Sequence, residues 1–114
     1  MGRRWKNAEG FKAAVLIWAE TVGVKPGEIH LRPMRTKWAS ISRASRRLTF
    51  DSGLLTVDRE WGEYVILHEV LHVKIPNHGK LFKSFLYSYM PKWEKLVKRY
   101  GDLFKKDRAT SEVM

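Results

Sequence analysis

The chain has 114 residues, 44% of them hydrophobic, and contains five Trp, four Tyr and five Phe. This length and composition suit one compact domain with a hydrophobic core and leave little room for a second domain. The absence of cysteine excludes disulfides, thiolate catalysis and cysteine-ligated zinc. We therefore expect His, Asp or Glu to hold any metal. We also expect a cytoplasmic location, because a chain without disulfides suits a reducing compartment.

Positive charge dominates the sequence, with 22 Lys and Arg against 12 Asp and Glu and a net charge of +10. The excess is uneven, because the segment Arg32–Arg47 contains no acidic residue and the stretch Lys92–Arg108 is also basic. A field of this sign attracts phosphates, nucleic acid or acidic peptides, although it also keeps a surface solvated. Nucleic acid bound through Arg32–Arg47 is therefore one candidate partner.

Apolar runs in the sequence are short. The longest uninterrupted one, Ala13–Ala19, falls far below the ~20 residues that span a bilayer. Glu20 follows it, without the small-residue pattern of a signal-peptide cleavage site. We expect no membrane partner and no targeting segment.

The first part of the chain predicts one helix and a small sheet. Apolar residues recur on one helical face over Phe11–Val22, and Gly23 is a typical helix end. Extended patterns follow, interrupted by Pro33 and by a hairpin turn at residues 43–46, and they cover Glu28–Arg32, Lys37–Ser42 and Arg47–Phe50. We expect these segments to form a three-stranded sheet of the antiparallel type.

The second part of the chain predicts three helices. Asp58 is a suitable N-cap for a helix over Arg59–Lys74, which Pro76 must end because proline has no N–H to donate. A further helix should begin at 77–80 and run to Met90, and a last one should cover Lys92–Tyr100. The order of elements indicates an α+β fold. We expect one domain over residues 1–114, with a core at about 11–104 and a flexible tail at 105–114.

The most informative segment lies in the first of these three helices, where His68-Glu69-Val70-Leu71-His72 has the H-E-x-x-H pattern. Positions i and i+4 share one face of a helix, so His68 and His72 can hold one metal ion together. The surrounding residues are mostly apolar, which is typical of a buried helix and unlike a chance match on a solvated surface. A buried carboxylate at Glu69 would be costly without a purpose.

A third histidine, His78, follows just after the helix-ending Ile75-Pro76-Asn77. A turn there can bring its imidazole back towards His68 and His72. Catalytic zinc sites typically use three protein ligands and keep a fourth position for water. The pattern predicts one Zn²⁺ ion bound by these three histidines. Glu69 is then expected to act as general base on the metal-bound water that attacks a carbonyl or phosphoryl group.

Other segments combine with the zinc motif into a pattern that is more specific than the motif alone. They are Met34 to Ser40, Pro76 to His78, Phe82, and Met90-Pro91 with Trp93. With them the chain resembles the YgjP-like metallopeptidase family, relatives of the SprT-like zincins, over most of its length. The resemblance implies a zincin-like fold with an N-terminal helix, a small sheet, an active-site helix and C-terminal helices. It also implies zinc at His68, His72 and His78, with Glu69 as base, in a single minimal catalytic domain.

Three residues of the basic segment are candidates for substrate binding: Arg35, Lys37 and Trp38. Arginine recognises carboxylate or phosphate, and the edge of a strand can pair with an extended peptide. Trp38 also suits the core between the sheet and the metal-binding helix, and we favour that role for it.

Three functions remain open at this point. The leading one is a small zinc metallopeptidase that acts on peptides or proteins. A metal-dependent nucleotide phosphohydrolase, such as a pyrophosphatase, would use the cations of Arg32–Arg47 to bind phosphates. A DNA-associated SprT-like protease or binding module would use the same cations to bind nucleic acid.

Overall fold

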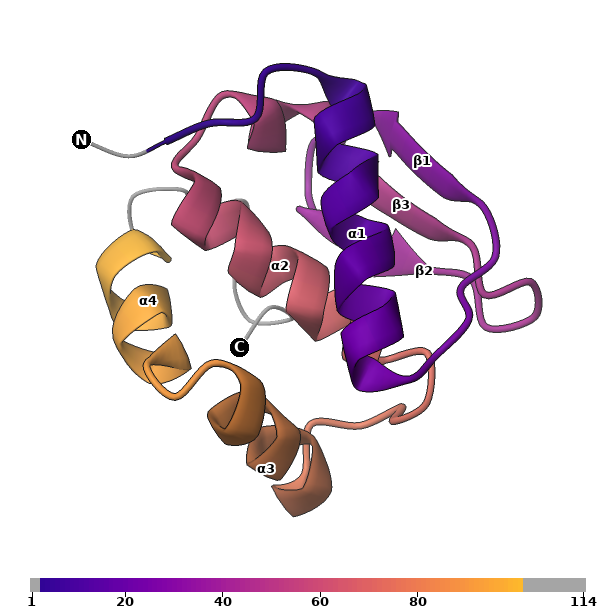
Figure 1. Ribbon diagram of the computed structural model, residues 1–114, viewed down its shortest axis with the longest axis vertical. Coiled ribbons are helices and arrows are strands. Elements are labelled where there is room, and N and C mark those ends of the chain that lie inside the picture. Colours follow the sequence, from indigo (N-terminus) through magenta and orange to yellow (C-terminus); the bar gives the residue numbers. More distant parts are fainter. Residues whose placement is uncertain (1–2, 102–114) are drawn as a thin grey trace.

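A computed structural model describes residues 3–101, in which one helix precedes three strands and further helices follow them (Figure 1). In chain order the elements are α1 (Ala8–Val22), β1 (Ile29–Arg32), β2 (Ala39–Ile41), β3 (Leu48–Asp51), the short 3-10 helix η1 (Ser52–Leu55), α2 (Arg59–Leu71), α3 (Lys80–Tyr89) and α4 (Trp93–Tyr100). Every helix and strand expected from the sequence is present, and the α+β prediction is confirmed. The stretch predicted as a flexible tail, 105–114, lies outside the described residues.

The sheet is mixed, with the strand order β1-β3-β2. Strand β2 pairs antiparallel with β3 through the predicted hairpin, and Ala39 lies opposite Phe50. Strand β1 runs parallel to β3, with Ile29 opposite Leu48, so the expected antiparallel pairing is wrong for this strand. The hairpin returns β3 into the space between β1 and β2, and alternation within each strand cannot predict that insertion.

Helix α1 begins earlier than the apolar pattern indicated, because Asn7 caps it. The Asn7 side-chain oxygen accepts the backbone N–H of Gly10 at 2.9 Å. At the other end Gly23 has a φ of 87°, and its N–H donates to the Ala19 carbonyl at 2.9 Å. This left-handed position favours glycine and ends the helix where the sequence predicted.

Helix α2 lies at the centre of the molecule. It packs against α1, β2 and η1 on one side and against α3 and α4 on the other (Figure 1). Phe11 of α1 meets Phe50 of β3 with ring centroids 5.2 Å apart, which closes the core between helix and sheet. Apart from Glu63, α2 is buried from Trp61 to Leu71. This burial explains its apolar sequence.

The buried core begins at Trp5, ahead of the position near residue 11 that the sequence indicated. Trp5 is 6% exposed and packs edge-on against Phe11, with ring centroids 4.8 Å apart. The guanidinium of Arg59 lies 4.9 Å from the centre of the Trp5 ring. The backbone N–H of Arg59 donates to the Arg3 carbonyl at 2.6 Å. The N-terminal segment therefore packs against the start of α2.

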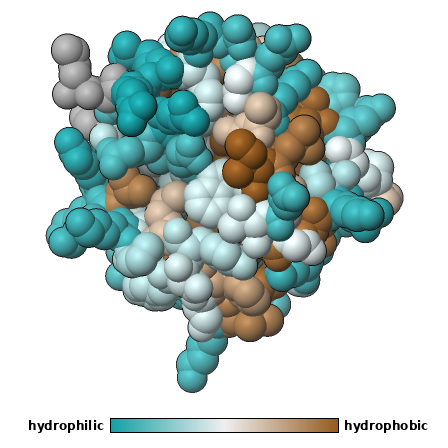
Figure 2. All heavy atoms as spheres, in the orientation of Figure 1, coloured by the Kyte–Doolittle hydropathy of each residue, from teal (hydrophilic) through white to brown (hydrophobic). Residues whose placement is uncertain are grey.

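The outer face of α1 exposes two large hydrophobic side chains, Leu16 and Ile17, at 55% and 63%. Figure 2 shows hydrophobic residues over α1 in the middle of this face, with hydrophilic residues around them. Within residues 3–101, no helix has both the length and the apolar character that crossing a bilayer requires.

Candidate metal centre

The candidate centre is built at the C-terminal end of α2. His68 and Glu69 lie in its last turn, and His72 is its C-cap residue. All three side chains are buried, with exposures of 2%, 7% and 7%. Polar groups are seldom buried this deeply without partners or a function.

The helix ends sooner than predicted, at Leu71 rather than near Lys74. The backbone N–H groups of the next residues still donate within the last turn, and two of them form tighter bonds than an α-helix has. Val73 and Lys74 each donate to the residue three positions back at 3.1 Å, and Ile75 donates to the Leu71 carbonyl at 2.9 Å. Pro76 has no N–H with which to continue this series. The chain therefore turns away from the helix axis immediately before His78.

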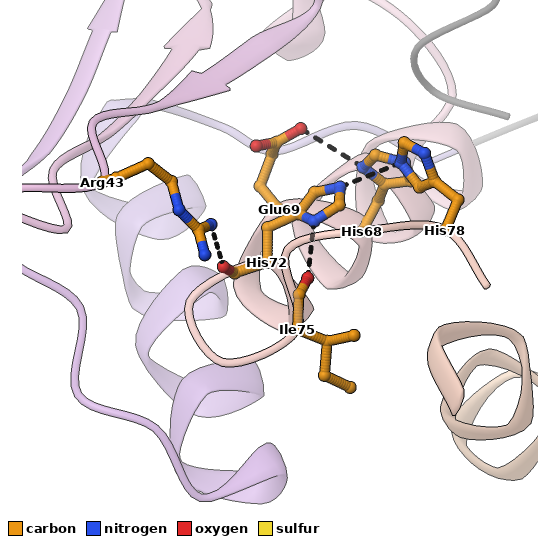
Figure 3. Close-up of polar contacts among 6 residues, drawn as sticks. All are labelled: Arg43, His68, Glu69, His72, Ile75 and His78. Atoms are coloured by element: carbon orange, nitrogen blue, oxygen red, sulfur yellow. Dashed lines mark hydrogen bonds and ion pairs between the residues drawn. The ribbon is translucent and has the colours of Figure 1, made fainter. Parts of the chain in front are cut away.

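This turn brings the three histidines together (Figure 3). The Nε2 atom of His78 lies 3.0 Å from Nε2 of His72 and 3.1 Å from Nε2 of His68. In the described part of the chain, these residues form a group whose potential ligand atoms all lie within 4.8 Å of one another. The convergence expected from the spacing is present, and His78 contributes to it from an exposed position on the loop before α3.

The geometry fits a zinc ion. Zinc lies about 2.0–2.1 Å from each imidazole nitrogen, which separates two ligands by roughly 3.3 Å in a tetrahedral site. The separations of 3.0 and 3.1 Å require only small side-chain movements to reach that value. Three imidazoles also suit zinc better than magnesium or calcium, which prefer oxygen ligands.

The second nitrogen of two of these rings has a defined partner. The His72 Nδ1 donates to the Ile75 carbonyl at 2.9 Å, because a carbonyl oxygen can only accept. The His68 Nδ1 lies 3.2 Å from Oε2 of Glu69, whose carboxylate accepts in the same way. With the proton on Nδ1, each ring has its Nε2 lone pair directed at the shared centre. This is the tautomer that a metal bound through Nε2 requires.

Burial also favours a neutral His72. It lowers the pKa of this imidazole below its usual value, and the neighbouring His68 lowers the pKa further. A protonated imidazole cannot bind a metal, so a depressed pKa keeps the lone pair available at neutral pH.

Phe82 holds the three rings from the side of α3. Its side chain is fully buried, and its ring centroid lies 5.2 Å from His68, 4.7 Å from His72 and 5.1 Å from His78. The ring stacks on His72 with an interplanar angle of 26°. Such contacts restrict the imidazoles without supplying a ligand atom. Phe82 matched the family pattern but was not among the predicted site residues.

The histidines and Glu69 face a cleft of about 410 Å³. Its wall includes the edge strand β2 and two cations, and the lining residues are Lys37, Ala39, Ser40, Ile41, Arg43, His68, Glu69, His72, Pro76 and His78. An edge strand and a group of candidate metal ligands therefore share one concave surface.

The three predicted substrate-binding residues lie in different surroundings. Lys37 lines the cleft. Trp38 is 5% exposed and packs near Trp61, with ring centroids 6.3 Å apart, so its side chain belongs to the core as we had favoured. Arg35 is exposed and is not among the residues that line the cleft.

The basic segment Arg32–Arg47 is divided between two surfaces. Lys37 and Arg43 line the cleft beside the histidines. Arg32 and Arg47 line a separate pocket over β1 and β3, together with His30 and Thr49. Sequence alone did not predict this division, because it depends on how the hairpin folds over the sheet.

Arg43 is a site residue that the sequence did not predict. Its Nη1 donates to the His72 carbonyl at 2.5 Å, across 29 positions in the chain. The hairpin that joins β2 to β3 brings it there. The basic character of the segment was the available signal, but the pattern did not distinguish Arg43 from its neighbours.

The match to known families covers nearly all of the described chain. The model of the YgjP-like metallopeptidase domain matches residues 3–100. The uncharacterized protein MJ0123 of Methanocaldococcus jannaschii is 38% identical over 69 residues, which cover 58% of this chain. The match spans 63% of that protein, which is less than two thirds of its length.

Two solved structures share the fold. The metallopeptidase zymogen of Pyrococcus abyssi abylysin has a TM-score of 0.75 at 19% identity, covering 85% of this chain and 97% of that one. The metallopeptidase zymogen of Methanocaldococcus jannaschii jannalysin has a TM-score of 0.72 at 28% identity, covering 82% and 97%. The predicted zincin-like fold is therefore confirmed.

Proposed function

Because the chain belongs to the YgjP-like metallopeptidase family, we propose that it is a zinc peptidase whose general base is Glu69. The observation that carries this proposal is the convergence of three Nε2 atoms beside a buried carboxylate, in a cleft walled by a strand edge. His68, His72 and His78 would hold one zinc ion. A bound zinc ion supplies a Lewis acid that polarises a carbonyl and lowers the pKa of water.

Glu69 would move the proton. Its carboxylate accepts one proton from the water that attacks the peptide carbonyl, and it returns a proton to the amine that leaves. His68 supports this role, because the contact from its Nδ1 to Oε2 at 3.2 Å holds the carboxylate over the site. The edge of β2 would align an extended peptide by backbone hydrogen bonds along the cleft.

The test is the Glu69→Gln variant. Glutamine keeps the size of the side chain but cannot accept the proton, so we expect zinc to stay bound while peptide turnover falls about 100-fold or more. Zinc content is measured by mass spectrometry and turnover on a pool of unstructured peptides, with and without a chelator. Wild-type turnover that survives complete zinc removal, or a Glu69→Gln variant as fast as wild type, contradicts the proposal.

A nucleotide phosphohydrolase is the second candidate, and the observation that favours it is the presence of Lys37 and Arg43 in the same cleft. Both side chains can bind the oxygens of a phosphate group as well as a peptide substrate. Release of phosphate or pyrophosphate from nucleoside triphosphates, assayed beside peptide cleavage under the same metal conditions, separates the two activities.

The DNA-associated alternative stays a prediction. The pocket lined by Arg32, Arg47, His30 and Thr49 is the feature that would bind phosphates outside the cleft. Binding to single- and double-stranded DNA, measured at several salt concentrations against a protein of equal net charge, tests it. A cytoplasmic location likewise stays a proposal, supported by the absence of cysteine.

A further inference from the structure

The cleft has an unequal distribution of charge. Lys37 and Arg43 contribute cations to its wall, while Glu69 is the one acidic residue among the lining residues within the described chain. Glu69 is engaged by the His68 Nδ1 at 3.2 Å. A substrate that enters the cleft therefore meets a positive rim around the residues proposed to carry out hydrolysis.

Arg43 is held in place beside those residues. Its Nη1 donates to the His72 carbonyl at 2.5 Å, and Figure 3 shows its guanidinium pointing to His72 on the side of the site away from His78. The hairpin that carries it is closed by two backbone hydrogen bonds, Ser42 N–H to Arg47 at 2.9 Å and Arg46 N–H to Ser42 at 2.7 Å. The guanidinium is therefore oriented before any substrate binds.

Arg43 has more donors than this contact uses. A guanidinium carries five N–H groups, and the hydrogen bond to the His72 carbonyl engages one of its nitrogens. No carboxylate within residues 3–101 forms an ion pair with Arg43. Arginine can bind a carboxylate through two parallel hydrogen bonds, and a position fixed in advance lowers the entropic cost of doing so.

We propose that Arg43 selects substrates that present a carboxylate to the cleft. This inference rests on the proposed peptidase function and names its substrate class. The carboxylate has two possible sources: an Asp or Glu side chain near the cleaved bond, or the C-terminal carboxylate of the peptide. Both offer the same two oxygens to the guanidinium.

The experiment uses zinc-loaded full-length protein and three pools of unstructured peptides of one length. The first pool is acetylated, amidated and free of acidic residues. The second is the same with Glu at varied positions, and the third is acid-free with a free C-terminal carboxylate. We expect kcat/KM to be about tenfold higher for the second or the third pool than for the first. Which of the two is preferred identifies the source of the carboxylate.

Two arginine variants then test the residue. Arg43→Met removes the guanidinium from the cleft, whereas Arg46→Met removes an equal charge from the exposed turn of the same hairpin. We expect the preference to fall to about onefold in Arg43→Met and to persist in Arg46→Met. Zinc-dependent cleavage of all three pools at equal rates by the wild type overturns the inference and leaves the peptidase proposal intact. A preference that survives Arg43→Met, or an equal loss on all pools, also overturns it, since Arg43 would then only support the His72 turn.

A binding measurement separates this inference from the proposed function. Fluorescence anisotropy of labelled peptides from each pool, with the Glu69→Gln protein, reports affinity without turnover. A preference of about tenfold for carboxylate-bearing peptides that disappears with Arg43→Met supports the inference even where no pool is cleaved, an outcome that sinks the peptidase proposal alone. Equal affinity for all pools overturns the inference.

Discussion

Phe82 contacts all three imidazoles of the candidate centre, although it offers no ligand atom. Its ring stacks on His72 and meets His68 and His78 at their edges. The three histidines come from α2, its C-cap and the loop that follows it, and Phe82 belongs to α3. A ring placed in this way sets the orientation of the imidazoles, so that less ordering remains for the metal to impose.

Replacing Phe82 by alanine should affect both stability and metal affinity. Loss of a fully buried aromatic ring typically lowers the free energy of unfolding by about 3–5 kcal/mol. The imidazoles also lose their common support, so we expect zinc affinity to fall about tenfold or more. Urea unfolding of the metal-free protein gives the first effect, and competition with a chelating dye gives the second. Leu86 on the same helix is also fully buried but has no aromatic ring to stack on an imidazole, and Leu86→Ala is the matched control. Equal zinc affinity in both folded variants contradicts the positioning role.

Residue patterns predicted the three histidines and Glu69, and they missed Arg43 and the contacts of Phe82 for a physical reason. His68, Glu69 and His72 follow from helical spacing within one turn, and His78 follows from the break at Pro76. Arg43 and Phe82 reach the site through the hairpin and through the packing of α3. Contacts of this kind depend on tertiary structure, and nothing within a few residues of either side chain indicates them.

At the scale of elements, the N-terminal segment and α2 pack unusually closely. A Cβ atom added at Gly62 would lie 2.4 Å from Cζ3 of Trp5, closer than real Cβ contacts allow. The ring cannot easily move, because it is held between Phe11 and the Arg59 guanidinium. The glycine at this helical position is therefore explained by the indole that packs on it.

This contact predicts that Gly62→Ala changes the free energy of unfolding in opposite directions with and without the Trp5 ring. In the wild-type background, Gly62→Ala should lower the free energy of unfolding by about 1–3 kcal/mol, because it overpacks the Trp5 site. In the Trp5→Ala background the same change should raise it by about 1 kcal/mol, because alanine is the better helix former. Urea unfolding of the four proteins in a double-mutant cycle measures both values. The explanation fails if Gly62→Ala has the same effect in both backgrounds.

The elements themselves were largely predictable from the sequence, and their pairing was not. Apolar periodicity indicated α1, Asp58 and Pro76 indicated α2, and Pro91 with Gly101 bounded α4 close to its observed limits. Strand β1 was expected to be antiparallel and is parallel to β3, because the order of strands in space is set by the crossover of the chain and not by the residues of one strand. The early end of α2 at Leu71 has a similar origin, since Ile75 must turn back to accept from His72.

For the whole molecule, the candidate centre joins a buried helix to an exposed loop. His68 lies in the buried central helix and His72 caps its end, whereas His78 lies on an exposed loop before α3. A metal held by all three would link this loop to the core. Since such a site does not exist in the unfolded chain, the free energy of metal binding adds to that of folding.

Zinc should therefore stabilise the protein through His78. At free zinc about 1,000-fold above Kd, the free energy of unfolding rises by about 4 kcal/mol, which corresponds to an increase in Tm of roughly 15 °C. His78→Ala should leave the Tm of the metal-free protein nearly unchanged, because the side chain is exposed, and should remove most of the zinc-dependent increase. Differential scanning calorimetry with chelator measures the Tm of the metal-free protein, and the same measurement with zinc gives the zinc-dependent increase. The exposed His30, which lies outside the centre, is the matched control: His30→Ala should retain the full increase. A zinc-dependent increase that survives His78→Ala would show that the ion is bound elsewhere, because two imidazoles on α2 cannot account for the same affinity as three.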